Sequence, residues 1–214
     1  MKTIIVKIGG SLLHKTTIID TLSEILTSLN ARIALIPGGG VFANKVRELF
    51  VRHEISSVEA HYMAIKAMEV YSILLTSRIK NSRLCSSLEQ ARSAMDEGKI
   101  AIILPYKIIS KTRALPALWK ITSDSIAVFL AALLKADFAI LLKSVDGVFI
   151  DGKIVRELKA GRIRSLKGYA DDYILELIRK YKVKVAIING LKPEILRLIV
   201  QGEHCPYPYT VITA

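Results

Sequence analysis

The chain has 214 residues, of which 51% are hydrophobic, and its formal net charge is +12. This length and apolar content suffice for one large domain with a sizeable core, and no apolar run is long enough to cross a bilayer. The two cysteines, Cys85 and Cys205, are far apart and lack metal-ligand spacing, so the sequence offers no disulfide framework and no zinc site. We therefore expect a cytoplasmic protein without a membrane segment.

The positive charge makes nucleic acid the first partner to consider. The basic residues are scattered, however, and the aromatic residues are few and do not alternate with them as a single-strand binder requires. A solvated surface rich in lysine and arginine explains the charge as well, and so does a positive field that attracts a small anionic substrate. We do not expect nucleic acid as a partner.

A short apolar, β-branched run from Thr3 to Ile8 predicts a buried first strand, interrupted near its end by Lys7. Gly9 and Gly10 follow at once. A strand that ends in two glycines and leads into a helix exposes backbone N–H groups, which favour an anion. Lys7 would add a cation beside that site.

The same arrangement follows in the next unit. A helix is expected from Thr16 or Thr17, either of which can cap it, to about residue 30, and a strand over 32–36. The glycines of segment 37–40 end that strand, and a helix is expected over 41–52. Two glycine turns at strand ends suggest two phosphate sites, although each could be only a tight turn. Neither a GxxxxGK[ST] nor a GxGxxG fingerprint occurs.

Ser56 or Ser57 can cap a longer helix that runs over 58–80. His61, near its start, is either a packed or surface histidine or a substrate contact. The elements expected next are a helix over 88–97, a strand over 99–104, and an irregular basic segment over 106–120. That segment is either a loop over the site or a surface connection.

Thr122 or Ser123 can cap a helix that runs to about residue 135 and carries Asp124 in its first turn. A carboxylate there suits the helix dipole, which alone could explain it. The elements expected after it are a strand over 137–142, a turn over 143–147, a hairpin around Asp151–Gly152, a helix over 169–181, a strand over 183–188, a helix from Pro193, and an edge strand over 209–212.

Strands thus alternate with helices along most of the chain. This order predicts a three-layer α/β/α sandwich with a mostly parallel central sheet. We expect one domain over residues 1–214, with a lobe up to about residue 120 that holds one substrate and a second lobe that holds the other. Ligands of such folds lie at the carboxyl ends of the strands.

Four stretches together resemble the amino-acid kinase superfamily: VKIGGSLL, IPGGGVFANKVR, ITSDSIAVFLAALLKADFAILLKSVDGVF and INGLKPEIL. The resemblance covers nearly the whole chain. It implies the carbamate kinase-like fold and an ATP-dependent phosphotransferase, with the acceptor in the first lobe and ATP in the second. It also implies Mg²⁺ held mostly by ATP oxygens rather than by the protein, and a homo-oligomer.

The resemblance also assigns residues. Lys7 would follow the charge as the phosphoryl group moves, and Asp124 would orient it. The residues at ATP and its phosphates would be Gly9, Gly10, Ser11, Lys143, Asp146 and Gly147. The acceptor-binding residues would be Gly38, Gly39, Gly40 and Asn44.

Within the family, PGGGVFAN followed by AHYMAIKAM resembles the archaeal kinases of methanofuran biosynthesis, which phosphorylate the monoester [5-(aminomethyl)furan-3-yl]methyl phosphate to a diphosphate. The alternatives are a uridylate kinase-like enzyme or another small-molecule kinase of the family, and, from a different class, a non-catalytic nucleotide-binding protein. For the ammonium of an aminomethylfuran, the candidate carboxylates are Glu59, Asp171 and Asp172.

Two departures from the family pattern stand out. Lys143 and Ser144 replace the Thr-Asp pair that many members carry before Val-Asp-Gly, which puts the nucleotide contact there in question. Some relatives also use a second lysine late in the chain, after a glycine-rich turn. The matching region here, SLKGYADDYILEL, lacks that pattern, and whether Lys143 or Lys167 serves instead stays open.

Overall fold

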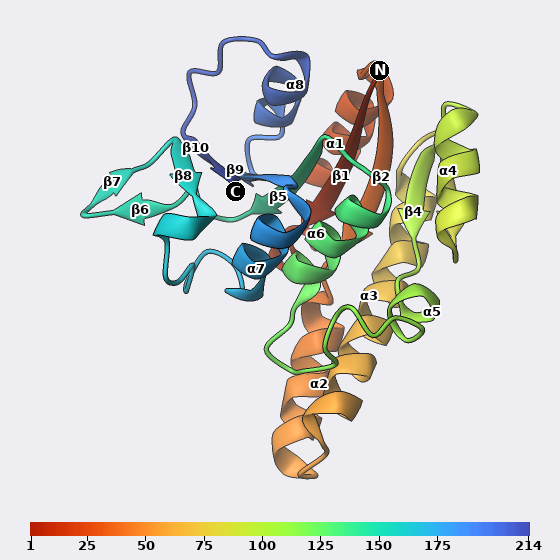
Figure 1. The fold of residues 1–214 in the computed structure, drawn as a ribbon. Helices are drawn as coiled ribbons and strands as arrows, with labels where there is room; N and C mark the ends of the chain where they lie inside the picture. Colours follow the sequence, from red (N-terminus) through yellow and green to blue (C-terminus); the bar gives the residue numbers. More distant parts are fainter.

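The computed structural model describes residues 1–214, and eight strands form its main sheet (Figure 1). These strands are β1 (Lys2–Ile8), β2 (Ala31–Pro37), β3 (Ser82–Cys85), β4 (Ile100–Ile103), β5 (Phe138–Lys143), β8 (Glu157–Lys159), β9 (Lys184–Asn189) and β10 (Tyr209–Thr213). Their order is β3-β4-β2-β1-β5-β9-β10-β8, and only the β9–β10 pair is antiparallel. A separate hairpin joins β6 (Phe149–Ile150) to β7 (Lys153–Ile154).

Helices lie on both faces of this sheet, as expected for a three-layer α/β/α sandwich (Figure 1). They are α1 (Thr16–Ser28), α2 (Gly40–Arg52), α3 (Ser57–Arg78), α4 (Leu88–Asp96), α5 (Tyr106–Ile109), α6 (Ser123–Leu133), α7 (Tyr173–Tyr181) and α8 (Glu194–Gln201), with short 3₁₀ turns η1 (Gly10–Leu12) and η2 (Ala160–Arg162). The paired helices α2 and α3 project beyond one end of the sheet. None of the helices combines the length and apolarity that crossing a membrane requires.

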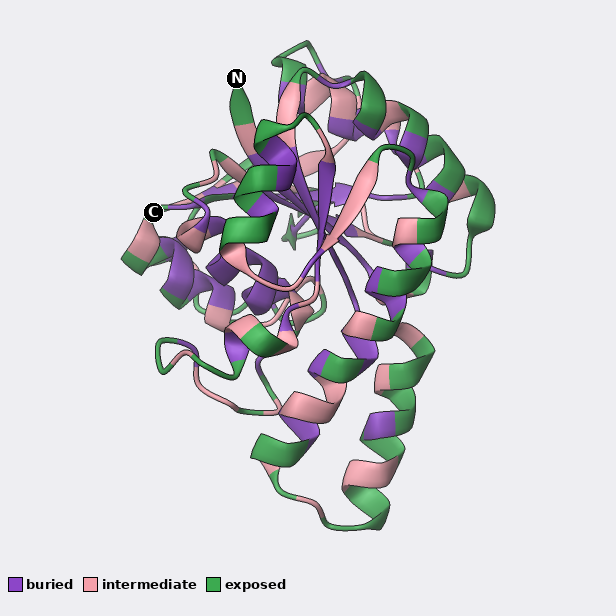
Figure 2. Cartoon of the chain, turned by 90° about the vertical axis from the view of Figure 1, so that its right-hand side faces the viewer, coloured by how far each residue is buried: buried purple, intermediate pink, exposed green.

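The side-chain alternation of the central strands divides the core into two layers. In β1, Ile5 faces the layer that contains α4, α6 and α7, whereas Ile4 and Val6 face the layer that contains α1 and α8. Figure 2 shows the central strands as the buried part of the molecule, with exposed residues on the outer faces of the helices. Burial on both faces explains why these strands read as continuous apolar runs.

Several local predictions are confirmed. The Ser56 side chain caps α3 and completes a capping box with Glu59, and Thr122 caps α6. Asp151 and Gly152 form the turn of the β6–β7 hairpin, and their φ values are 50° and 74°. Two successive residues with positive φ are typical of the tight turn that Asp-Gly favours.

Other local predictions are wrong. Neither threonine caps α1, because its N-cap is Lys15, which makes no side-chain hydrogen bond to the helix. Strand β10 is not an edge strand, since the short polar strand β8 pairs with its outer side. The helix expected from residue 169 begins at Tyr173, and the basic segment 106–120 contains the short helix α5. Strand β3 was not predicted at all, because its four residues carry no apolar run.

Candidate active site

Two lysines reach the same side of the sheet from neighbouring strands. Lys7 follows Ile5 by two positions on β1, and Lys143 follows Leu141 by two positions on β5, so both point into the layer that contains α6. Strands β1 and β5 are parallel and adjacent. The two ammonium groups therefore lie together at the carboxyl ends of the central strands, where α/β folds bind ligands.

Asp124 lies between these lysines, in the first turn of α6. Its Oδ1 is 2.7 Å from Lys7 Nζ, and its Oδ2 accepts a hydrogen bond of 2.6 Å from Lys143 Nζ. The side chains of Lys7 and Asp124 are about 5% exposed, whereas that of Lys143 is 21% exposed. One buried carboxylate thus holds two cations at the edge of a cavity, with Lys143 the more accessible of the two.

The combined effect of burial and the neighbouring charges lowers the pKa values of both Asp124 and Lys7. Burial would raise the pKa of Asp124, but the two lysines outweigh it and hold this pKa below its usual range. Burial lowers the pKa of Lys7. The negative charge of Asp124 raises this pKa but offsets the effect of burial only partly, because the like charge of Lys143 lowers it further. The carboxylate is therefore the best-stabilised charge, and a further anion such as a phosphate would stabilise Lys7 in its protonated form.

The two glycine turns pack directly against each other at the ends of β1 and β2. A Cβ on Gly10 would come 2.7 Å from the backbone nitrogen of Gly40, and a Cβ on Gly38 would come 2.7 Å from that of Gly10. A Cβ on Gly9 would likewise lie 2.7 Å from the carbonyl oxygen of Leu142. These glycines are thus required for close backbone packing, as expected if they serve only to form tight turns. The same packing also brings both turns to one cavity.

That cavity has a volume of about 720 Å³ and lies between the glycine turns, α2, α3 and the start of α6. Of the predicted site residues it is lined by Gly10, Ser11, Gly38, Gly39, Gly40 and Asn44. The Asn44 side chain accepts a hydrogen bond of 2.8 Å from Arg47, which also lines the cavity. A second, smaller cavity of about 400 Å³ contains Lys7, Asp124 and Lys143.

The structure does not bring every predicted site residue to these cavities. Asp146 accepts a hydrogen bond of 2.8 Å from Asn189 and lies 3.5 Å from Lys192. Gly147 has a φ of +137° and packs on Thr210. These two residues shape the turn after β5 and line neither cavity.

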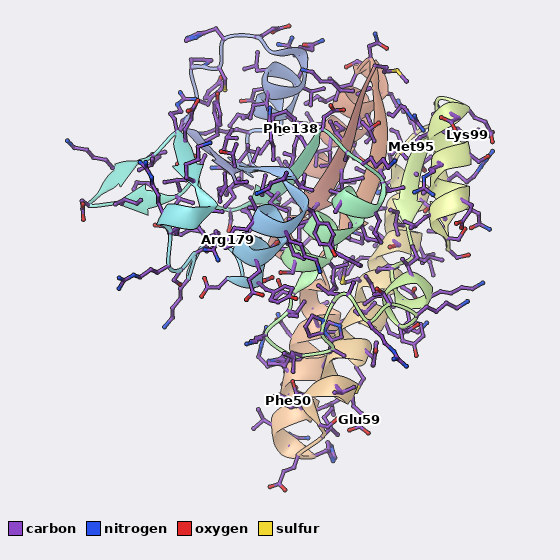
Figure 3. The ribbon with its side chains drawn as sticks, in the orientation of Figure 1. Phe50, Glu59, Met95, Lys99, Phe138 and Arg179 are labelled. Carbon is purple, nitrogen blue, oxygen red and sulfur yellow. The ribbon has the colours of Figure 1, made fainter.

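The carboxylates considered for an ammonium group are all engaged elsewhere. Glu59 closes the capping box of α3, on the projecting pair of helices (Figure 3). Asp172 accepts from Ser165 and from the backbone of Leu166. Asp171 binds the start of α6, and none of the three lines the large cavity.

Residues of the segment 106–120 and of α3 complete the lining of the large cavity. Trp119 stacks with Phe50 at a ring distance of 5.2 Å, and the Arg47 guanidinium lies 5.7 Å from the centre of the Trp119 ring. The backbone N–H of Trp119 donates a 2.7 Å hydrogen bond to Ser57. The segment that carries Trp119 is thereby fastened against α2 and α3 and forms a wall of the cavity, which favours the loop interpretation of residues 106–120. His61 also lines the cavity: it is 2% exposed, and its buried Nε2 has no hydrogen-bond partner in the structure.

A mostly parallel sheet whose carboxyl edge carries two glycine turns and a cluster of two lysines and one carboxylate provides the positioning and charge neutralisation that a phosphotransferase needs. The chain belongs to the amino acid kinase family, whose model matches residues 2–189. It is thus an ATP-dependent phosphotransferase that acts on a small molecule.

Two curated relatives extend over nearly the whole chain. It is 32% identical over 207 residues to the [5-(aminomethyl)furan-3-yl]methyl phosphate kinase of Methanocaldococcus jannaschii, with 95% of each chain covered. It is 23% identical to the uridylate kinase of Pyrobaculum arsenaticum, with 94% of this chain and 96% of that one covered. Among solved structures, the uridylate kinase from Archaeoglobus fulgidus superposes over both whole chains with a TM-score of 0.77 at 22% identity, which confirms the predicted fold.

Proposed function

We propose that this protein transfers the γ-phosphoryl group of ATP to a small phosphate monoester and so makes a diphosphate, with [5-(aminomethyl)furan-3-yl]methyl phosphate as the acceptor. The observation that carries the proposal is the pair of ammonium groups on Asp124, next to a glycine-floored cavity of about 720 Å³. The 32% identity to the kinase of that name supports this choice of acceptor.

The lysine pair would supply the charge neutralisation that phosphoryl transfer needs. Lys7, anchored on Asp124, would contact the transferring group, and Lys143 would face it from β5. In the glycine turn after β1, the backbone N–H of Gly10 would bind the phosphates of ATP, whereas that of Gly9 donates a 2.9 Å hydrogen bond to the Leu142 carbonyl and fixes the turn. An acceptor phosphate oxygen is already a competent nucleophile, so no general base is required.

Mg²⁺ fits this arrangement as a partner of the nucleotide rather than of the protein. Both carboxylate oxygens of Asp124 are occupied by lysines, so the cluster offers no free carboxylate to a cation. The ion would therefore be held by phosphate oxygens, where it would neutralise charge on the triphosphate. Lys7 and Lys143 would still position the transferring group.

The acceptor would lie in the large cavity, with its phosphate on Gly38, Gly39 and Gly40, and Asn44 beside it. The opposite wall contains an aromatic and a basic side chain, Trp119 and Arg47, which would suit a planar, polar acceptor ring. Both the furan ring of an aminomethylfuran and the pyrimidine ring of UMP could pack against this wall. Uridylate kinase-like activity is therefore the second candidate, supported by the match to the uridylate kinases.

A panel of acceptors tests the proposal. ADP formation is measured with the aminomethylfuran phosphate, UMP, isopentenyl phosphate and glutamate, each with ATP and Mg²⁺. We expect the highest kcat/KM with the aminomethylfuran phosphate and none above background for Lys7→Met, which keeps the side-chain length without the charge. A higher kcat/KM with UMP would support uridylate kinase-like activity, the second candidate, instead. ATP binding without turnover of any acceptor would identify a non-catalytic nucleotide-binding protein.

A further inference from the structure

Asp171 is a buried carboxylate that binds the start of α6, the helix that carries Asp124. Its Oδ2 accepts hydrogen bonds from Thr122 Oγ1 at 2.6 Å, from the Thr122 backbone N–H at 3.1 Å and from the Ser125 backbone N–H at 3.2 Å. Its Oδ1 accepts from Ser125 Oγ. Four donors, two from the N-cap Thr122 and two from Ser125 in the first turn of α6, thus converge on a carboxylate 46 or more positions later in the chain.

This contact continues to Asp124 itself. Thr122 Oγ1, which donates to Asp171, also accepts a 3.2 Å hydrogen bond from the Asp124 backbone N–H. The path from Asp171 to the cluster therefore contains one hydroxyl group and one peptide. Movement of Asp171 would shift the N-terminal turn of α6, and with it the carboxylate that both lysines share.

Asp171 also changes the charge of the site. It lies in the same small cavity as Lys7, Asp124 and Lys143. The second cation of the site comes from Lys143 on β5, and the later segment supplies a second carboxylate. Two ammonium groups are thereby matched by two carboxylates before any substrate binds. Burial raises the pKa of Asp171, its hydrogen bonds oppose this, and the nearby Asp124 charge raises it further.

We infer that Asp171 is a positioning residue of the phosphoryl-transfer site: it holds the N-terminus of α6, and so Asp124 and its two lysines, in place and balances the charge of those lysines. This inference rests on the proposed function, because it assigns Asp171 a role in the same site. Asp171 is one of the three carboxylates that the sequence offers as candidates for a substrate ammonium, but in the structure both of its oxygens already accept hydrogen bonds from the protein.

Steady-state kinetics of Asp171→Asn test this role, with Asp172→Asn as the matched control. Asp172 lies in the same segment but binds only Ser165 and Leu166. We expect Asp171→Asn to lower kcat by roughly 10- to 100-fold with little change in the KM of the acceptor, because misplacement of a catalytic group acts on the transition state. Asp172→Asn should stay within about threefold of the wild type. Equal losses in both variants would overturn the inference.

The pH dependence separates positioning from a general loss of stability. The charged groups that face Lys7 are Asp124, Lys143 and Asp171. Asp171→Asn removes one negative charge, so Lys7 should lose its proton at lower pH and the alkaline limb of kcat should shift to lower pH. Ser125→Ala, which removes one donor and no charge, should lower kcat less and leave that limb in place. An unshifted limb in Asp171→Asn would refute the charge balance.

An NMR titration tests the inference even if no acceptor is turned over. The lysine side-chain signals of isotope-labelled protein are followed with pH, and Lys7 is assigned by its loss in Lys7→Arg. The Lys7 pKa should be lower in Asp171→Asn than in the wild type and unchanged in Asp172→Asn. An unaltered Lys7 pKa in a folded Asp171→Asn protein would overturn the proposal, whereas an inactive wild type would count against the proposed function alone.

Discussion

Replacement of Lys143 by methionine asks whether this residue is the second lysine of phosphoryl transfer. Lys143 Nζ lies 2.6 Å from Asp124, whereas Lys167 makes no contact with the cluster and lines a different cavity. Methionine keeps much of the length of the side chain and removes the charge together with the hydrogen bond to Asp124 Oδ2. Asp124 retains its pair with Lys7 in this variant, so the fold should persist.

The expected loss follows from the electrostatics of the site. Two unit charges about 4 Å apart interact by about 4 kcal/mol at an effective dielectric constant of about 20. The Lys143 side chain is 21% exposed, so solvent reduces this value. We expect the transition state to lose about 3 kcal/mol, which corresponds to a fall in kcat of roughly 150-fold.

The assay measures ADP formation at saturating ATP and acceptor, with the acceptor of highest turnover in the panel. Lys167→Met is the matched control, and thermal unfolding establishes that both variants fold. We expect Lys143→Met to lose roughly 150-fold in kcat and Lys167→Met to remain near the wild type. The reasoning is refuted if Lys143→Met stays within about threefold of the wild type or if Lys167→Met loses as much.

Three further predictions concern the scaffold. Gly38→Ala should destabilise the protein by about 1–3 kcal/mol and abolish turnover, because the added Cβ would lie 2.7 Å from a backbone nitrogen of the facing turn. Gly161→Ala is the control: nothing lies within 4 Å of its added Cβ, so its thermal unfolding should match that of the wild type. Ser56→Ala removes half of the capping box and should cost about 1 kcal/mol, or a Tm decrease of about 2–4 °C; an unchanged Tm would show that the cap is not needed. Hydrogen bonds from Arg83 lower the pKa of Glu97 from 4.5 to about 2, so this pair should stabilise the fold above pH 4.5 and lose its effect as the pH falls to about 2. Glu97→Gln should therefore make the free energy of unfolding less dependent on pH between about 4.5 and 2, and an unchanged pH profile would contradict this.

The sequence alone determined the order of the elements and the position of the glycine turns. These features depend on local physics: β-branched apolar runs form buried strands, glycine accepts positive φ and close backbone approach, and Ser56 or Thr122 caps the helix that begins beside it. Local patterns failed where pairing with a distant strand decides the structure, as in the four-residue strand β3 and the inner position of β10.

The candidate site depends more strongly on the tertiary structure. Lys7 and Asp124 could be selected from the sequence by family resemblance, but no spacing could show that Lys143 rather than Lys167 shares the Asp124 carboxylate. Nor could it show that Asp171 binds the start of α6, because that contact joins residues 46 or more positions apart. Which charges balance one another is a property of distance in space, and it was decided only when β1, β5 and α6 packed together.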